Sequence, residues 1–273
     1  MPDFYYRSST GAVIDFRSSA SWGDEIGIHS YAWAYDAENN RIGRFSRKPA
    51  EIPLRVYFRA DTASDCAALR SETYAVFDSD VRTQSPGRLY YGAYYLECYI
   101  TAMGDERANI DYTTIQTALT IVAPSPDWHT EQAFQFLPSA QTDDGLDFPF
   151  DFPFDCAVEM PGEGVLDNGY AFPADFRLTI YGPAVSPSIS IGGHTYALTD
   201  EVPEASHIVI DSAERTIVRI TNTGQKSNWF GKRFKPESIF QKISVGRTQV
   251  RWDGSFGFDL TLIDTRSEPV WEA

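Results

Sequence analysis

The sequence contains few of the residues from which metal centres and nucleophilic active sites are usually built. Among 273 residues it has three cysteines, which are Cys66, Cys98 and Cys156. Their odd number and wide spacing fit neither a disulfide framework nor a zinc site. It also has four histidines, which are His29, His129, His194 and His207. The histidines are scattered and have no cysteine close by in the sequence, so we expect neither a metal site nor a cofactor.

Motifs that signal catalysis are also missing. The sequence has no Gly-x-Ser-x-Gly elbow, no phosphate loop, no His-Glu-x-x-His and no dinucleotide fingerprint. A glycoside hydrolase would need two carboxylates at a defined separation, and Glu97, Glu159 and Glu163 are the conceivable candidates. Acidic residues are so plentiful that these three do not stand out. We therefore predict that the protein is not an enzyme and has no catalytic residues.

Basic residues are in the minority, with 23 Lys and Arg against 38 Asp and Glu and a formal net charge of −15. This balance argues against nucleic acid as the main ligand, because phosphate contacts need clustered positive charge. The first residues carry no basic-then-apolar signal, and no apolar run approaches membrane-spanning length. We expect a soluble protein made in a reducing cytoplasm, with no signal peptide and no membrane insertion.

The most unusual stretch that is present runs from Leu137 to Cys156. Within it, Asp-Phe-Pro-Phe occurs twice in succession, at 147–150 and 151–154. Proline excludes both a helix and a central sheet strand here, so an extended connector is predicted. Its expected anchors are the four phenylalanines Phe148, Phe150, Phe152 and Phe154. Each would contribute about 2–3 kcal/mol if buried, so we expect the connector to be clamped on a surface. Its aspartates lack the glycine turn of a calcium loop, and we predict no metal.

The sequence before this connector alternates like β-strands, and one strand is expected over Ile28–Tyr35. From Ile52 to Arg59, Leu54, Val56 and Phe58 point inward. One helix is predicted over about 62–81, because Thr62 and Asp65 resemble a capping box. The residues that fall on one face of this helix at helical spacing are Cys66, Leu69, Thr73, Val76 and Phe77. The polar and basic stretch from Asp36 to Pro49 is predicted to form a projecting loop or arm.

The sequence after the connector reads as short strands separated by Gly, Pro, Asn and Asp, without a helix of any length. Gly192-Gly193 marks a tight hairpin, and Ile208–Ile210 is expected to pair with Thr216–Ile220. A further short strand is expected from Phe240 to Ile243. We therefore predict a mainly β protein of two β-sandwich domains, the second jelly-roll-like. The predicted boundaries are 1–136 for the first domain with its single helix, 137–156 for the connector and 157–273 for the second domain.

Motifs in a fixed order along the chain carry a resemblance to a known family. In the first half they are the helix Asp65–Val81, Pro86–Tyr91, Tyr94–Tyr99 and Ala123–Pro126. In the second half they are Asp151–Asp155, Tyr181–Pro183 with Pro187, Ile208–Ser212, Ile239–Phe240, Val245–Gly246, Val250–Trp252 and Arg266–Trp271. In this order the chain resembles, over almost its whole length, the distal tail protein (Dit) family of siphophages, whose tails are long and non-contractile.

The resemblance implies a structural role at the phage tail tip. Members of the family form a hexameric ring from their N-terminal domains, single or stacked in pairs, and carry outward-facing galectin-like C-terminal domains. The implied partners are further copies of the chain, the tail-tube protein, the tail-tip or tail-associated lysin protein, and receptor-binding or baseplate proteins that serve host attachment. DNA would pass through the lumen without specific binding, and an acidic wall would repel it. The implied location is the virion tail tip, after assembly in the bacterial cytoplasm.

Candidate site residues follow from these readings. For contacts between subunits we predict residues of the arm, namely Arg41, Ile42, Arg44, Phe45, Arg47 and Lys48. We interpret Asp211, Trp252 and Trp271 as residues that stabilise the fold. Two other functions remain open at this point. A carbohydrate-binding jelly-roll module used for adhesion would place Tyr and Trp side chains against sugars, and a glycoside hydrolase is the third choice.

Overall fold

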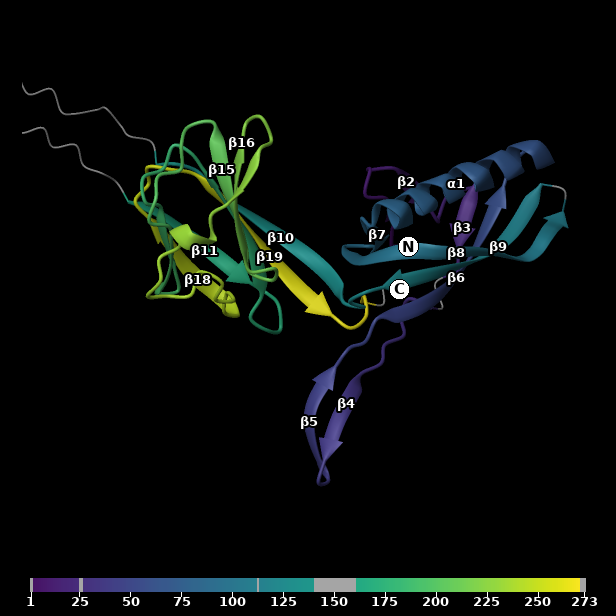
Figure 1. Cartoon of the computed structure of the whole chain (residues 1–273), viewed down its shortest axis with the longest axis horizontal. Coiled ribbons are helices and arrows are strands. Elements are labelled where there is room, and N and C mark those ends of the chain that lie inside the picture. The colour runs from purple at the N-terminus through teal and green to yellow at the C-terminus, as the bar shows by residue number, and fades with distance from the viewer. Residues whose placement is uncertain (1, 25–26, 112, 140–160, 271–273) are drawn as a thin grey trace, which may run out of the picture. The chain divides into compact units, whose positions relative to one another are not determined.

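The computed structural model describes residues 2–24, 27–111, 113–139 and 161–270. The chain divides into two compact units, and Figure 1 shows their elements. Unit 1 comprises Met1–Thr130 together with Thr265–Ala273, and unit 2 comprises Glu131–Asp264. The division differs from the predicted boundaries, because unit 2 begins before 137 and the last residues return to unit 1. Most of the predicted connector lies outside the described residues, but both of its flanks belong to unit 2.

Unit 1 contains nearly all of the elements before residue 130. Its strands are β1 (Phe4–Arg7), β2 (Val13–Asp15), β3 (Ser21–Gly23), β4 (Ala34–Glu38), β5 (Arg41–Ser46), β6 (Ala50–Arg59), β7 (Gly87–Tyr91), β8 (Tyr94–Asp111) and β9 (Thr114–Ala123). Its helix is α1 (Ala63–Thr83), and the start of β10 (Trp128–Phe136) completes it. Among the described residues α1 is the single α-helix, so the predicted fold class is confirmed in this half.

The long strand β8 connects the two halves of the unit 1 sheet. Its first residues pair with β7, which continues through β1 to β2, and its later residues pair with β9, which continues through β6 to β3. The predicted alternation is confirmed in β6, where Leu54, Val56 and Phe58 are buried and Arg55 is exposed. Helix α1 packs over β8 and β6 and covers the core of this unit.

Thr62 begins the helix as the sequence predicts. Its side chain accepts a hydrogen bond from the backbone N–H of Asp65 at 3.1 Å, which satisfies one of the unpaired donors of the first turn. The helix ends at Gln84, whose φ of +54° places it in the left-handed region and whose N–H bonds to the last turn. The buried face carries Cys66, Thr73 and Phe77 as predicted, together with Asp80, which the sequence does not single out.

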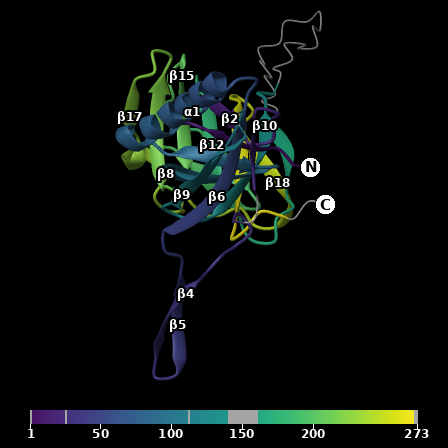
Figure 2. The same ribbon diagram turned by 90° about the vertical axis from the view of Figure 1, so that its right-hand side faces the viewer.

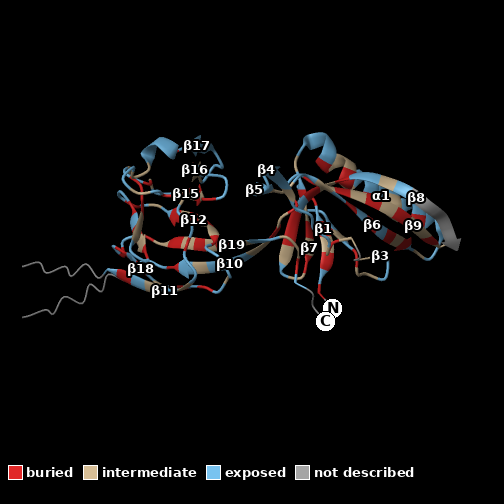
Figure 3. Ribbon diagram, turned by 90° about the horizontal axis from the view of Figure 1, so that it is seen from below, coloured by how far each residue is buried: buried red, intermediate tan, exposed pale blue. Residues whose placement is uncertain are grey.

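Unit 2 is a sandwich of two antiparallel sheets. Its elements are β11 (Gly162–Asn168), β12 (Asp175–Tyr181), β13 (Ser188–Ile191), β14 (His194–Ala197), β15 (Ser206–Asp211), β16 (Thr216–Thr221), β17 (Lys226–Asn228), the 3-10 turn η1 (Phe230–Lys232), β18 (Gly246–Trp252) and β19 (Phe258–Arg266). One sheet has the order β17-β16-β15-β12-β19-β10, and the other has the order β11-β18-β13-β14. The core between them is a separate apolar cluster, and the buried positions of Figure 3 lie along its strands.

Two predicted features of unit 2 are confirmed and one is wrong. Gly192 and Gly193 form the β13–β14 turn with φ of +60° and +84°, a conformation that favours glycine. The two strands predicted to pair on either side of the turn at 211–214 are β15 and β16, and they do pair. The strand expected from Phe240 to Ile243 is not formed; Ile243 makes only an isolated bridge with Ala174.

Trp252 packs at the centre of the unit 2 core. Its indole N–H donates to the carbonyl of Phe256 at 3.0 Å, and its ring lies where any side chain on Gly162 would stand. A Cβ at Gly162 would lie 2.2 Å from the ring, so any larger residue at position 162 would clash with Trp252. The role of Trp252 as a fold residue stays a prediction, and Trp271 lies outside the described residues.

Candidate assembly surfaces

A hairpin made of β4 and β5 projects from unit 1, where the sequence predicts an arm (Figure 1, Figure 2). The two strands pair only with each other, with Tyr35 opposite Phe45 and Asp36 opposite Arg44. Asn39 and Asn40 make the turn with φ of +51° and +58°, a geometry that asparagine tolerates in tight hairpins. The predicted loop is therefore a two-stranded arm.

The arm exposes apolar side chains that have no cover within unit 1. The exposed fractions of Tyr35, Ile42 and Phe45 are 62%, 56% and 57%. A two-stranded hairpin by itself is marginally stable in water, and exposed apolar patches mark contact surfaces. The arm thus has the properties of an element that is completed by another molecule.

Arg47 fixes the base of the arm to unit 1. Its guanidinium donates to the carboxylate of Asp127 at 2.6 Å and to the carbonyl of Ser267 at 3.5 Å. It also lies 5.5 Å from the centre of the Trp33 ring, which it stacks over. Its side chain is only 7% exposed. A groove of about 460 Å³ runs beside it, with Trp33, Lys48 and other residues on its walls.

The six predicted contact residues of the arm therefore fall into two groups. Five are exposed, and they are Arg41, Ile42, Arg44, Phe45 and Lys48. Arg47 is the exception, because its side chain is occupied by Asp127 and Ser267 within the same unit. Arg47 anchors the arm, and the remaining five are available for contact with another molecule.

A buried carboxylate joins the first hairpin of unit 1 to its helix. Asp80 is 0% exposed and accepts a hydrogen bond from the Tyr6 hydroxyl at 2.7 Å. Its other oxygen accepts from both the backbone N–H and the hydroxyl of Ser9. Burial, and then the hydrogen bond to Asp80, raise the pKa of Tyr6 well above its ordinary value. Nearby, burial raises the pKa of the Cys98 thiol to about 12. The Tyr6 hydroxyl and the Cys98 thiol therefore keep their protons at neutral pH.

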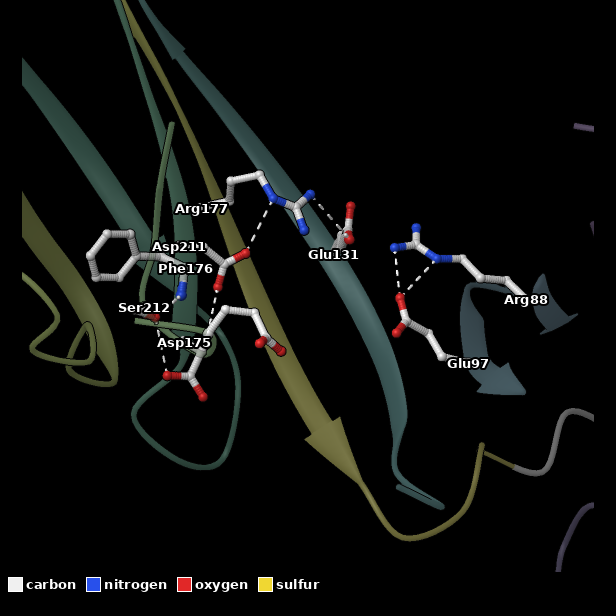
Figure 4. Close-up of polar contacts among 9 residues, drawn as sticks. Arg88, Glu97, Glu131, Asp175, Phe176, Arg177, Asp211 and Ser212 are labelled. Carbon is white, nitrogen blue, oxygen red and sulfur yellow. Dashed lines mark hydrogen bonds and ion pairs between the residues drawn. The ribbon is translucent and has the colours of Figure 1, made fainter. Parts of the chain in front are cut away.

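Polar side chains of unit 2 form two sets of contacts, where β12 begins and where β15 ends (Figure 4). In the first, Arg177 lies 3.5 Å from Asp211 and 3.8 Å from Glu131. The role of Asp211 as a fold residue stays a prediction. In the second, Asp175 accepts from Ser212 at 3.1 Å, and the Ser212 hydroxyl accepts from the backbone N–H of Phe176 at 2.7 Å. Such contacts hold strand ends in register.

Two of the three carboxylates considered for glycoside hydrolysis are paired with an arginine. Glu97 lies 2.9 Å from Arg88 in unit 1, as Figure 4 shows, and Glu163 lies 3.3 Å from Arg251 in unit 2. Glu97 and Glu163 belong to different units, and Glu159 lies outside the described residues. Over the part of the chain that the structure describes, no group of three or more His, Cys, Asp or Glu residues could hold a metal ion. Within that same part, no helix has the length and apolar character needed to cross a membrane.

Comparison with known proteins identifies the architecture. No family model matches the sequence, and no curated protein matches it. Solved structures do match. A chain from the phage P2 baseplate in its activated conformation with Ca superposes with a TM-score of 0.59 at 11% identity, covering 98% of this chain and 100% of that one. The SPP1 Dit protein, a hub of the adsorption apparatus in phages that infect Gram-positive bacteria, superposes with a TM-score of 0.54 at 9% identity. This chain has the Dit fold.

The Dit fold extends over both units. The SPP1 Dit match covers 96% of this chain and 99% of that one, and the P2 baseplate structure with Sr matches over a similar extent, with 98% and 99% covered at 10% identity. The predicted resemblance is thus confirmed as a likeness of fold at low sequence identity. Low identity also explains why the sequence comparisons find nothing, since strand patterns are preserved while individual residues are not.

Proposed function

We propose that this protein is a structural hub of a siphophage tail tip, and that it forms a hexameric ring. The observation that carries the proposal is the match of the whole chain to phage baseplate and Dit proteins, with 96% to 98% of its length covered. Both units take part in that match, so the likeness is not limited to a common sandwich domain. In this role the ring joins the tail-tube protein to the tail-tip protein.

The arm supplies contacts between neighbouring subunits in this proposal. Its exposed residues Ile42 and Phe45 offer apolar surface, and Arg41, Arg44 and Lys48 offer positive charge. The chain as a whole carries a net charge of −15, so the surface of a second copy is acidic on average and suits the basic side chains of the arm. Unit 1 is the ring-former, and unit 2 carries receptor-binding or baseplate proteins that attach to the host.

The proposed role is non-catalytic and places the protein in the virion. Assembly takes place in the bacterial cytoplasm, and the ring then stays at the tail tip. Its lumen lets DNA pass without specific binding, because acidic walls repel phosphates. Neutralising acidic residues that line the lumen should slow DNA ejection, and unchanged ejection kinetics would argue against a role for wall charge.

The ring is tested by light scattering on the purified full-length chain over a concentration series, with negative-stain images of the heaviest species. We expect particles of six or twelve copies of the 30.6 kDa chain with an open centre. The same measurement is made after co-expression with the tail-tube and tail-tip proteins of the same phage, because partners can complete a weak interface. A monomer under both conditions would overturn the proposal. A monomer whose spectrum shifts on glycan titration would favour the carbohydrate-binding alternative.

A further inference from the structure

Residues 215–235 of unit 2 form a basic run in an acidic chain. The run contains six basic residues and no Asp or Glu, although acids outnumber bases by 38 to 23 in the sequence as a whole. The six are Arg215, Arg219, Lys226, Lys232, Arg233 and Lys235. A cluster of one sign within a chain of the opposite sign attracts a partner of opposite charge.

The basic run folds into one border of unit 2. Strand β16 pairs with β17 through Val218 opposite Asn228 and Ile220 opposite Lys226. Strand β17 is the last strand of its sheet, and all three of its residues are exposed (Figure 3). A groove of about 300 Å³ lies on this border, lined by both strands and by the ring of Phe230. Edge strands of this kind accept an additional extended segment.

Half of the six charges are used within unit 2, and the other half are not. Lys232 pairs with Asp200 at 2.6 Å, and Arg219 lies 5.6 Å from the centre of the Trp229 ring. The guanidinium of Arg233 lies 3.9 Å from the centre of the Phe230 ring. Arg215, Lys226 and Lys235 are exposed and make no ion pair with any described residue. Arg215 and Lys226 line the groove, so its polar walls carry unneutralised positive charge.

The sequence of the chain contains a segment of matching chemistry. Residues 140–160 have the same length as the basic run and carry six acids and no Lys or Arg. They also carry the four phenylalanines that need cover, within the repeated Asp-Phe-Pro-Phe sequence. The residues on either side of the segment, Ser139 and Pro161, belong to the same unit as the basic border.

We propose that the acidic segment 140–160 binds the groove along β16 and β17 of the same unit 2. Its carboxylates would neutralise Arg215 and Lys226, and phenylalanines would cover the apolar floor beside Phe230. The segment is long enough to reach the groove. Its 21 residues extend over roughly 70 Å, so a loop with both ends attached to unit 2 can reach a point about 35 Å away. A unit of this size has a diameter of about 35 Å, so every face lies within that distance.

The groove fits a peptide better than a nucleic acid or an anionic sugar. Those ligands would need a free aromatic face for stacking, whereas the Phe230 ring already stacks with Phe240 and carries Arg233 over it. An extended peptide uses the backbone groups of an edge strand, which β17 provides. The proposal does not depend on ring formation, so it and the proposed function can fail separately.

Cys156 lies within the acidic segment and gives a test in the full-length chain. Ser227→Cys places a second thiol in the groove, and Val185→Cys, 72% exposed in the same unit, is the control. Each variant is oxidised with copper phenanthroline, and the intramolecular disulfide to Cys156 is quantified by mass spectrometry. Cys66 and Cys98 are buried and do not compete.

We expect the disulfide from Ser227→Cys to form about tenfold faster than that from Val185→Cys, since a bound segment has a high effective concentration at one site only. Val185 lies two residues after Pro183, and Pro183 lines a groove together with Pro138, which is close to the start of the segment. If the segment were not bound, Cys156 should therefore react at least as fast with the control cysteine at 185. Adding Arg215→Glu and Lys226→Glu should remove the preference, and Asp147→Lys with Asp151→Lys should restore it. Equal rates at the two positions, or disulfides formed only between chains, would overturn the proposal.

Discussion

Asp80 is one residue whose burial links two distant parts of unit 1. It lies 74 positions from Tyr6 in the sequence, on the helix face that packs against the β1–β2 hairpin. Three donors, the Tyr6 hydroxyl and the N–H and hydroxyl of Ser9, satisfy its two oxygens. A carboxylate held in this way is stabilising only while all of its donors remain.

Replacement of Asp80 by Ala should lower the free energy of unfolding of unit 1 by about 2–3 kcal/mol, because the Tyr6 hydroxyl and the Ser9 N–H are then left unpaired. Tyr6→Phe removes one donor and should cost about 1 kcal/mol. Urea denaturation measures both. Asp78→Ala is the matched control on the same helix, since Asp78 pairs with the exposed Arg82 and should change stability by less than about 0.5 kcal/mol. Equal losses for Asp78→Ala and Asp80→Ala would contradict this account.

Cys98 should make the stability of unit 1 fall in alkaline solution. Burial raises its pKa in the folded state to about 12 from an ordinary value of 9.0, so the unfolded chain loses its proton first as pH rises. The stability contributed by the buried thiol is fully present below pH 9 and is lost towards pH 12. Between pH 9 and 10, urea denaturation should show a drop of at most about 1.4 kcal/mol per pH unit that is absent in Cys98→Ala. An identical pH dependence in both proteins would show that the thiol does not cause it.

At the scale of elements, the arm differs from the strands of the core because its apolar side chains face outward. Core strands such as β6 stabilise unit 1 by burying alternate residues. The arm has Tyr35 and Phe45 paired across its strands, yet both are exposed. The contact between Arg47 and Asp127 therefore holds the arm in place at its base, and the side chains beyond the base remain exposed.

Replacing Ile42 and Phe45 together by Ser should weaken self-association without unfolding unit 1. The two side chains are more than half exposed, so their loss should change the free energy of unfolding by less than about 0.5 kcal/mol. Analytical ultracentrifugation should show the dissociation constant of the oligomer rising at least about tenfold, as expected for apolar interface residues. The control is Phe172→Ser with Val185→Ser, which removes two apolar groups from unit 2 that are even more exposed. Loss of association in the control but not in the arm variant would refute the role of the arm.

The sequence predicts those elements whose signal is local. The alternation of β6, the cap at Thr62 and the glycine pair of the β13–β14 hairpin each depend on neighbouring residues, and each is confirmed. The strand expected over Ile28–Tyr35 is largely wrong: β4 begins only at Ala34. Ile28 instead turns into the core with 0% exposure. That position depends on packing with distant residues.

Site residues follow the same rule. The arm is predictable because its polar and basic composition is continuous in the sequence. Asp80 is not, since an acidic residue on a helix normally indicates a solvated face, and only the remote Tyr6 and Ser9 make its burial favourable. The basic border of unit 2 combines both cases: its charge is visible in the sequence, but the edge position of β17 is visible only in the structure.

At the scale of the whole molecule, the division of the chain into units is discontinuous. Unit 1 takes residues from both ends of the described sequence, and unit 2 lies between them. The returning residues make specific contacts in unit 1. Arg266 donates to the Tyr94 hydroxyl at 3.2 Å, and the carbonyl of Ser267 accepts from Arg47. Pro269 is buried.

Removal of residues 265–273 should therefore destabilise unit 1 and leave unit 2 unchanged. We expect a loss of about 1–2 kcal/mol from the two hydrogen bonds and the apolar cover. Hydrogen exchange should speed up in β8 near Tyr94 and at the base of the arm near Arg47, and it should stay constant in β12 and β15. Faster exchange throughout unit 2 would show that the units are not independent in this respect.

The same discontinuity sets an order of events during synthesis. A ribosome makes all of unit 2 before it reaches Thr265, so unit 2 can fold while unit 1 still lacks its last residues. Arg47, at the base of the arm, receives its contact from Ser267 only after unit 2 has been synthesised. A chain that stops before Thr265 therefore lacks one of the contacts that attach the arm to unit 1, and the arm is fully anchored later than unit 2 is made.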